Sequence, residues 1–286
     1  MRSLLFTPAN SARKIEKALS CGADAVVLDL EDSVAPSQKE DARRGARDAL
    51  MSAQANGPRV IVRVNGLASG EIEADLDAIA GLAPYAIMLP KARGGDDAQH
   101  LSTKLAVREA QYGLPDGSIR IAPIATESAD ALFRLASYRA STARLTALIW
   151  SAEDLMAIVG AQANRLPGGG WTPPFATARS LALFAAASAG VPAIDAAFVD
   201  FRDINALRRE CGEARRDGFS GKLAIHPDQV AVINETFSPS QDELARARRI
   251  FEVFSASPDA GVLTLDGAMI DAAHLAWAKR TLENNG

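Results

Sequence analysis

Residues 25–32 read AVVLDLED, an almost unbroken apolar run that ends in three acids within four positions. A short apolar run of this kind is typical of a β-strand buried on both of its faces, as the strands of parallel sheets are. Barrel enzymes built on parallel strands carry their functional side chains at the carboxyl ends of those strands. The stretch therefore predicts a buried parallel strand followed directly by acids that belong to a functional site.

The same kind of run recurs along most of the chain, with longer stretches of helical period between the runs. Eight strands, each followed by a helix, in a chain of 286 residues predict a (β/α)8 TIM barrel over residues 1–236. A doubly wound open sheet is the alternative, but no glycine-rich dinucleotide fingerprint follows the first strand. The predicted strands are Ser3–Thr7, Ala25–Leu30, Val60–Val64, Ala86–Leu89, Ile119–Ala125, Leu145–Trp150, Ala193–Phe198 and Leu223–Ile225.

Residues 237–286 follow the eighth unit and are predicted to form a separate extension with the character of a helical lid. A helix is expected over Ser240–Phe254, because a serine start signal and early acids precede its apolar positions. A break at residues 257–259, a strand at Val262–Leu265, a turn at Asp266-Gly267 and a last helix from about Asp271 should follow. The glycine- and proline-rich residues 166–174 are expected to form a loop over the barrel mouth.

The bulk composition narrows the class of protein. Hydrophobic residues make up 48% of the chain and charged residues 23%, which is typical of a soluble globular protein. The net charge of −4 argues against nucleic acid as a partner. The most apolar later stretch, Leu181–Ile194, is too short to span a membrane, and no signal peptide is evident. Cys21 and Cys211 have no metal-ligand spacing, so a reduced, cytoplasmic protein is expected.

Acids gather at the carboxyl ends of the predicted strands. Such a gathering is unfavourable through mutual repulsion unless a cation lies among the acids. Carboxylates with little histidine and no cysteine favour Mg²⁺ or Mn²⁺ over zinc. The strand-end residues are Asp29, Glu31, Asp32, Arg63, Asn65, Lys91, Glu127, Glu153, Asp154, Asp195, Asp200 and His226.

Arg63 adds a second function to this predicted metal site. Its planar guanidinium can hold a substrate carboxylate with two parallel hydrogen bonds. A metal ion beside it can chelate the carbonyl and one carboxylate oxygen of a 2-oxo acid, and so polarise the carbonyl for attack by a carbanion. The combination indicates a metal-dependent aldolase or a Claisen-type enzyme.

Each of these residues also has a purely structural interpretation. Asp32 and Asp154 could be helix N-caps, and Arg63 could serve only to neutralise the neighbouring acids. Lys91 could be a Schiff-base lysine or a surface ion-pair partner. His226 could be a hydrogen-bonded strand end or a substrate contact.

Several short motifs, in order along the chain, resemble one known family. The chain is similar to the citrate lyase β-subunit-like and malyl-CoA lyase family of CoA-thioester lyases, within the HpcH/HpaI aldolase superfamily. The motifs that carry the resemblance are Arg2-Ser3-Leu4-Leu5-Phe6, Gly22-Ala23-Asp24-Ala25, Leu28-Asp29-Leu30-Glu31-Asp32, Arg63-Val64-Asn65, Met88-Leu89-Pro90-Lys91-Ala92, Glu153-Asp154-Leu155, Asp200-Phe201-Arg202-Asp203 and Ile225-His226-Pro227.

The resemblance implies a barrel in which Glu127 and Asp154 hold Mg²⁺, with Mn²⁺ as a possible substitute. It places Arg63, together with the metal ligand Glu127, against the 2-oxo acid. Asp29, Glu31 and Asp32 would surround the metal through its water molecules.

The resemblance also assigns roles outside the acidic cluster. Arg13 and Lys17, one helical turn apart, would meet the phosphates of coenzyme A. Asp271 in the extension would enter the site of an adjacent subunit and transfer a proton to or from the acyl-CoA carbon. Family members form trimers or dimers of trimers. The structural alternative for Asp271 is an acid at the start of the last helix.

The expected reaction is Mg²⁺-dependent cleavage, or formation, of a 3-hydroxyacyl-CoA of the malyl-, citramalyl- or citryl-CoA type. The products would be acetyl-CoA or a related acyl-CoA and a 2-oxo acid. A thioesterase acting on the same thioester is one alternative, and a β-subunit of a multi-subunit citrate lyase that acts on a carrier-protein thioester is another. A class I aldolase that uses Lys91 or Lys222 is a third.

Overall fold

The computed structural model describes residues 1–258 and 260–283. Asp259, which belongs to the predicted break at 257–259, and the last three residues lie outside the described part. The chain divides into two compact units, the first covering Met1–Asn234 and the second beginning at Glu235.

The first unit is built on eight parallel strands. They run in the order β5-β4-β3-β2-β1-β8-β7-β6, and the two ends of this order meet through parallel bridges from Ile121 to Leu145 and from Ile124 to Ile149. The sheet is thereby closed into a ring, and the predicted (β/α)8 barrel is confirmed. The strands are β1 Ser3–Pro8, β2 Ala25–Asp29, β3 Arg59–Arg63, β4 Ala86–Leu89, β5 Arg120–Pro123, β6 Leu148–Ile149, β7 Ala193–Asp195 and β8 Gly221–Ala224.

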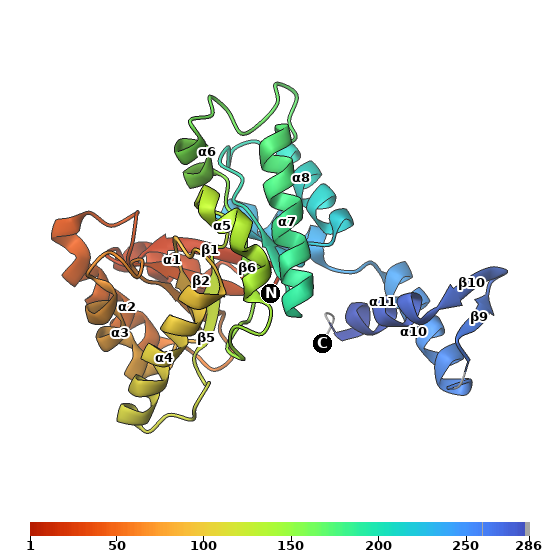
Figure 1. Cartoon of the computed structure of the whole chain (residues 1–286), viewed down its shortest axis with the longest axis horizontal. Coiled ribbons are helices and arrows are strands. Elements are labelled where there is room, and N and C mark those ends of the chain that lie inside the picture. The colour runs from red at the N-terminus through yellow and green to blue at the C-terminus, as the bar shows by residue number, and fades with distance from the viewer. Residues whose placement is uncertain (259, 284–286) are drawn as a thin grey trace. The chain divides into compact units, whose positions relative to one another are not determined.

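Helices follow the strands and lie outside them (Figure 1). Local chemistry sets their ends: Ser128 and Asp203 cap the N-termini of α5 and α8, and glycines in the left-handed region end α4, α6, α7 and α8. The α-helices of this unit are α1 Ala12–Ser20, α2 Lys39–Ser52, α3 Ile72–Ile79, α4 Gly95–Tyr112, α5 Ala129–Arg134, α6 Glu153–Val159, α7 Pro173–Ala189, α8 Ile204–Asp217 and α9 Asp228–Phe237, which runs into the second unit. Short 3₁₀ helices lie at Pro36–Gln38, Ala80–Leu82 and Leu135–Tyr138.

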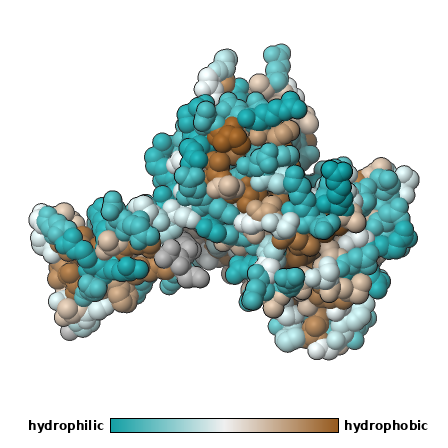
Figure 2. Space-filling view, turned by 180° about the vertical axis from the view of Figure 1, so that it is seen from behind, coloured by the Kyte–Doolittle hydropathy of each residue, from teal (hydrophilic) through white to brown (hydrophobic). Residues whose placement is uncertain are grey.

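The surface shown in Figure 2 is largely hydrophilic, with apolar side chains gathered in several places on both units. The most exposed large apolar residues include Phe133, Phe184 and Met269. Within residues 1–258 and 260–283, no helix is long and apolar enough to cross a membrane.

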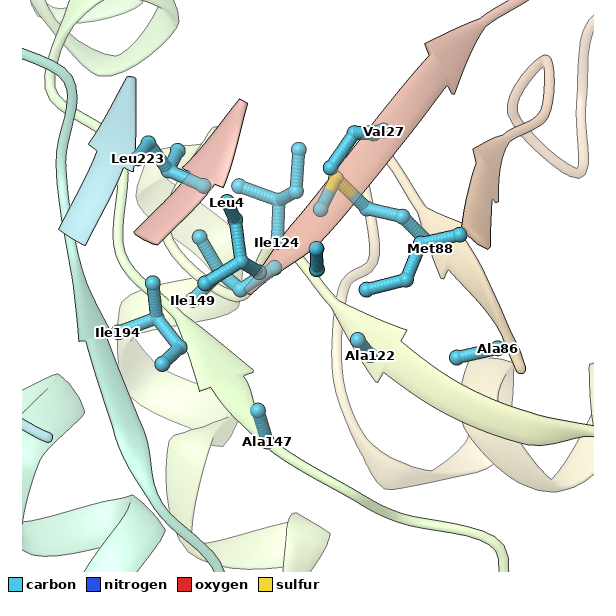
Figure 3. Close-up of a cluster of buried hydrophobic side chains, with 12 residues drawn as sticks. Leu4, Val27, Ala86, Met88, Ala122, Ile124, Ala147, Ile149, Ile194 and Leu223 are labelled. Atoms are coloured by element: carbon cyan, nitrogen blue, oxygen red, sulfur yellow. The ribbon is translucent and has the colours of Figure 1, made fainter. Parts of the chain in front are cut away.

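Alternate residues of the barrel strands point into its centre, where they form one apolar cluster (Figure 3). Strand β2 contributes Ala25 and Val27, and strand β3 contributes Ile61. The next positions on the same inward-facing rows are Asp29 and Arg63, which pair in register. The apolar interior therefore gives way to charged side chains at the carboxyl end of the barrel.

The second unit is a small α+β structure. Helix α10 Gln241–Ala256 begins with a capping box between Ser240 and Glu243, and it packs with α11 Ala272–Glu283 around Ile250, Phe254 and Ile270. The sequence predicted strand β9 Val262–Leu265 and the turn after it, but not the antiparallel partner β10 Ala268–Asp271. The turn residues Asp266 and Gly267 both have positive φ, which is the geometry of a two-residue hairpin.

Candidate active site

Asp29 and Arg63 form the base of the barrel mouth. The Arg63 guanidinium donates from Nε to Oδ1 and from Nη2 to Oδ2 of Asp29, each at 2.7 Å. The backbone N–H groups of Glu31 and Ser33 also donate to the Asp29 carboxylate. Burial alone would raise the pKa of Asp29, but Arg63 and the hydrogen bonds from Ser33 and Glu31 together outweigh burial and hold that pKa below its ordinary value. Asp29 is thus a fixed, ionised anchor for Arg63.

This pairing occupies only one edge of the Arg63 guanidinium. The other edge, formed by Nη1 and the second hydrogen of Nη2, remains, and Nη1 lies 3.3 Å from Oε2 of Glu31. The flat face of the guanidinium stacks on Phe6, 4.9 Å from the ring centre. Arg63 is therefore held in one orientation by three neighbours, with a second hydrogen-bonding edge turned to the acidic cluster.

Glu31, Asp32 and Lys91 form the next layer of the mouth. The ammonium group of Lys91 donates to Oε1 of Glu31 at 2.6 Å and to Oδ1 of Asp32 at 3.1 Å. Burial raises the pKa of Glu31, and the partial compensation by Lys91 and Arg63 does not cancel that effect. Oε2 of Glu31 is buried and has no hydrogen-bond partner among the described residues. Asp32 contacts Lys91 and caps no helix, since the residue before α2 is Gln38.

Glu127 and Asp154 lie beyond the ends of β5 and β6. Glu127 is 2% exposed and accepts a hydrogen bond at Oε2 from the backbone N–H of Lys91. Its pKa is raised well above the ordinary value, first by burial and then by the neighbouring carboxyl groups of Asp154 and Glu31. Asp154 stands in the first turn of α6, behind the N-cap residue Ala152, so it is not an N-cap. Two adjacent carboxylates repel each other, so this pair favours either a shared proton or a bound cation.

The donor set fits a magnesium ion. Mg²⁺ is commonly bound by one or two carboxylates, and water or substrate oxygens complete its shell. Within residues 1–258 and 260–283, no group of three or more histidine, cysteine, aspartate or glutamate side chains is placed to enclose a metal on its own. The pair Glu127 and Asp154 matches the open type of magnesium site, and Oε2 of Glu31, which has an ion-pair contact with Arg63 but no hydrogen bond, lies nearby.

A cavity of about 590 Å³ opens beside this cluster, between the loops that follow β2, β3 and β4. Glu31, Lys39, Asn65 and Lys91 are among its lining residues. A second cavity of about 500 Å³ lies where β5 and β6 begin, around Arg120 and residues 142–144. Glu31, Asp32 and Lys91 of the acidic cluster line the first cavity and do not line the second, so the first is the candidate for substrate.

Comparison with known proteins gives the family. The model of the HpcH/HpaI aldolase/citrate lyase family matches residues 2–227, and a model described as C–C bond lyase of the TIM-barrel fold matches residues 177–285. The chain belongs to the HpcH/HpaI aldolase/citrate lyase family. The resemblance seen in the sequence motifs is confirmed.

Named relatives of this HpcH/HpaI family protein differ in activity. It is 32% identical to the mitochondrial citramalyl-CoA lyase of Rattus norvegicus, over 97% of this chain and 84% of the relative. It is 33% identical to a (3S)-malyl-CoA thioesterase of Cereibacter sphaeroides, over 98% of this chain and 93% of the relative. The crystal structure of CitE from Mycobacterium tuberculosis in complex with magnesium, acetoacetate and coenzyme A superposes with a TM-score of 0.78 at 31% identity, covering 100% of this chain and 98% of that chain.

The other predicted site residues of this family member are Arg13 and Lys17 in the first unit and Asp271 in the second. Arg13 and Lys17 are exposed on α1, which begins shortly after β1 at the same end of the barrel. Asp271 ends β10 in the second unit, where its Oδ1 lies 2.8 Å from Nδ1 of His274 and accepts from the N–H of Ala273. Asp271 therefore makes the contacts that the structural alternative expects of an acid at the start of the last helix.

Asp195 and Lys222 do not belong to the mouth. Their neighbours Ile194 and Leu223 face the barrel interior, so the two side chains point outward. Lys222 is fully buried and donates to Asp195 at 2.6 Å and to Glu210 at 2.7 Å, and Asp195 also accepts from Trp150. A Schiff-base lysine must lose its proton, whereas burial, which lowers the pKa of Lys222, is outweighed by these acids, and its pKa is raised. The acids around Lys91 raise its pKa in the same way, which argues against a class I aldolase.

Sequence reasoning missed Lys39. Its ammonium group donates to the carbonyls of Leu30 and Glu31 and to Oδ1 of Asn65, at 2.6–2.8 Å. Lys39 therefore ties the loop after β2 to the loop after β3. No sequence motif marks Lys39, because it opens a helix and lies eight residues after Glu31, whose carbonyl it binds. His226 stacks on Phe201, with ring centres 4.6 Å apart.

Proposed function

We propose that this protein is a Mg²⁺-dependent carbon–carbon lyase that cleaves, or forms, a 3-hydroxyacyl-CoA thioester of the malyl-, citramalyl- or citryl-CoA type. The products are acetyl-CoA or a related acyl-CoA and a 2-oxo acid. The observation that carries the proposal is the pair of adjacent carboxyl groups, Glu127 and Asp154, next to Arg63 at the barrel mouth. Membership of the aldolase/citrate lyase family and the citramalyl-CoA lyase relative support it.

Glu127 and Asp154 are the proposed metal ligands. Bound Mg²⁺ would act as a Lewis acid on the carbonyl of the 2-oxo acid. Glu31 and Asp32 would accept hydrogen bonds from water on the ion, and Oε2 of Glu31 suits that role because it has an ion-pair contact with Arg63 but no hydrogen bond. Asp29 was expected to share it, but its oxygens already accept four hydrogen bonds from protein donors. Asp29 is better suited to orient Arg63.

Arg63 is the proposed carboxylate-binding residue. The structural alternative, in which it only neutralises acids, is partly realised in its pairing with Asp29. A guanidinium has five N–H donors, however, and this pairing uses two of them. The remaining edge can bind the carboxylate of a 2-oxo acid in a bidentate manner, and the Asp29 pair fixes its direction.

Asp271 is the proposed proton-transfer residue, supplied to the site of a second copy of the chain. In cleavage, the hydroxyl group gives up its proton to solvent water as its carbon becomes the carbonyl of the oxo acid. The bond between the α-carbon of the thioester and that carbon breaks, and its electron pair passes to the thioester as an enolate. The enolate then takes a proton from Asp271, and condensation runs the same transfer in reverse. His274 lowers the pKa of Asp271, and the resulting ionised form suits proton abstraction.

Three further features belong to the same proposal. Arg13 and Lys17, exposed on α1, would bind phosphates of coenzyme A. A homotrimer or hexamer would bring the Asp271 of one copy to the mouth of another, and the exposed apolar residues of both units would suit contacts between copies. A cytoplasmic location is proposed on composition, although the lyase relative from rat is named as mitochondrial.

The test is an assay of the purified protein with malyl-CoA and citramalyl-CoA, with Mg²⁺ and with EDTA. We expect Mg²⁺-dependent release of acetyl-CoA with glyoxylate or pyruvate, respectively. The Asp271→Asn variant should lose at least about 100-fold in turnover, since a positioned acid–base group contributes about 10²–10⁴-fold. Full activity in EDTA, or an active Asp271→Asn variant, would contradict the assigned roles.

Hydrolysis of the thioester is a second candidate function, because one relative is a (3S)-malyl-CoA thioesterase at 33% identity. The same assay separates the two: a thioesterase leaves free malate and coenzyme A, whereas a lyase leaves an acyl-CoA and an oxo acid. A β-subunit that acts on a carrier-protein thioester would be inactive on both free CoA substrates and active on the acylated carrier.

A further inference from the structure

Lys91 has a backbone conformation that is unusual for a residue with a side chain. Its φ is +54°, in the left-handed region, directly after Pro90 at the end of β4. A residue with a Cβ is disfavoured in this region because the Cβ comes too close to the following carbonyl oxygen, and turns of this kind favour glycine or asparagine. Such conformations persist where the surroundings require them, and they concentrate at functional sites.

In this conformation Lys91 contacts the acidic cluster through both its backbone N–H and its ammonium group. Its backbone N–H donates to Oε2 of Glu127. Its ammonium group reaches back to the loop after β2, where it donates to Glu31 at 2.6 Å and Asp32 at 3.1 Å. One residue therefore fixes three of the acids at the mouth, and these acids come from two different strand ends.

Glu127 depends on Lys91 for its hydrogen bond from the backbone. Among the described residues, the N–H of Lys91 is the one backbone donor that the structure gives to this buried carboxylate. Glycine at position 91 would relieve the left-handed backbone but would leave Glu31 and Asp32 without their shared cation. The ion pairs of the lysine side chain thus explain why lysine occupies a left-handed backbone position that glycine would adopt with less strain.

We propose that Lys91 is a positioning residue, whose left-handed backbone aims its N–H at Glu127 while its ammonium group sets the orientation of Glu31 and Asp32. The inference deepens the proposed function, on which it rests for the assignment of Glu127 as a metal ligand. Lys91 acts through these acids and does not itself touch the reacting atoms.

The two effects of the ammonium group on a bound divalent ion oppose one another. Its positive charge disfavours a second cation nearby, whereas its hydrogen bonds orient the acids that meet water on that ion. Removal of the charge should therefore leave metal binding equal or tighter while turnover falls. A residue that only held the fold together would weaken both.

The experiment compares Lys91→Met, Lys91→Gly and Lys91→Arg with Lys104→Met, which removes an ion-paired lysine on α4 away from the mouth. Mn²⁺ binding is followed by the electron paramagnetic resonance signal of the free ion, and its bound line shape is recorded. Turnover is measured at saturating Mg²⁺ and thioester. Lys91→Met and Lys91→Gly should each lose about tenfold or more in kcat, with an unchanged or smaller Mn²⁺ dissociation constant and an altered bound line shape.

Lys91→Arg should recover most of kcat, and Lys104→Met should match the wild type in both measurements. Lys91→Gly should also unfold at the wild-type temperature or above it, because glycine tolerates positive φ. Wild-type kcat in Lys91→Gly, or Mn²⁺ binding weakened in proportion to kcat, would overturn the proposal. Failure of the proposed function would show instead as a wild-type protein without metal-dependent turnover, and the Mn²⁺ comparison of wild type and Lys91→Met would still decide the role of Lys91.

Discussion

The barrel carries two buried charge networks that differ in how completely their groups are paired. Behind β7 and β8, Asp195 accepts hydrogen bonds from Trp150, Arg179 and Lys222, and the cation of Lys222 also meets Glu210. At the mouth, Glu127 lies beside other carboxyl groups, and Oε2 of Glu31 has no hydrogen-bond partner among the described residues.

The difference indicates which network serves the fold and which serves chemistry. Buried charges are tolerated when each is paired, and a fully paired network rigidifies the structure around it. A buried carboxyl with like-charged neighbours lowers stability and persists where a ligand or a reaction requires it. The rear network therefore holds α7 and α8 against the barrel, and the mouth is the part built for a ligand.

The largest expected effect is in the rear network. Lys222→Met removes a fully buried cation and leaves Glu210 and Asp195 without it, so we expect a loss of about 3–5 kcal/mol in the free energy of unfolding. Urea unfolding measures this loss, with Lys104→Met as a matched control that should change by less than about 0.5 kcal/mol. The folded fraction of Lys222→Met should keep wild-type kcat. A loss below about 1 kcal/mol would mean that the rear network does not stabilise the fold.

The sequence predicted the barrel well because its strands are short apolar runs that differ in character from the amphipathic helices. The prediction was less accurate where the direction of a side chain depends on the register of its strand. Asp195 was grouped with the acids at the strand ends, and only the inward position of Ile194 shows that Asp195 points outward. The predicted strand Leu145–Trp150 shortens to Leu148–Ile149 in the ladder, since neighbouring residues join β5 only through isolated bridges.

The candidate site was predictable in position but not in its pairing. Asp29 and Arg63 lie at the carboxyl ends of predicted strands, and Glu127 and Asp154 follow shortly after two others, so a barrel places all four at one end. The bidentate pair of Asp29 with Arg63 depends on their registered positions on β2 and β3, which the sequence does not encode locally. The left-handed backbone of Lys91 could not be predicted from the sequence either, because that conformation usually favours glycine.

An intermediate effect is expected at Asp29. Asp29→Asn removes the charge that anchors Arg63, and charge-assisted hydrogen bonds of this kind contribute about 1.5–3 kcal/mol. The folded pKa of Asp29 is lowered, so its stabilisation is present above the unfolded pKa near 3.8 and is lost as pH falls through the lower folded pKa. The stability gap between wild type and variant should therefore close in strong acid. The exposed Asp32→Asn is the control, and a gap that does not vary with pH would contradict the pairing.

The smallest effect, and the one of opposite sign, is expected at Glu127. Its folded pKa is raised, so the stability it contributes is complete below the ordinary pKa of 4.5 and is lost as pH rises through the folded pKa. Glu127→Gln should therefore gain about 1 kcal/mol over the wild type near neutral pH, with the gain vanishing in acid. Added Mg²⁺ should raise the unfolding temperature of the wild type but not of the variant, because only the wild type keeps both carboxylates. A variant that is less stable at neutral pH, or equally stabilised by Mg²⁺, would place Glu127 with the fully paired charges behind β7 and remove it from the metal site.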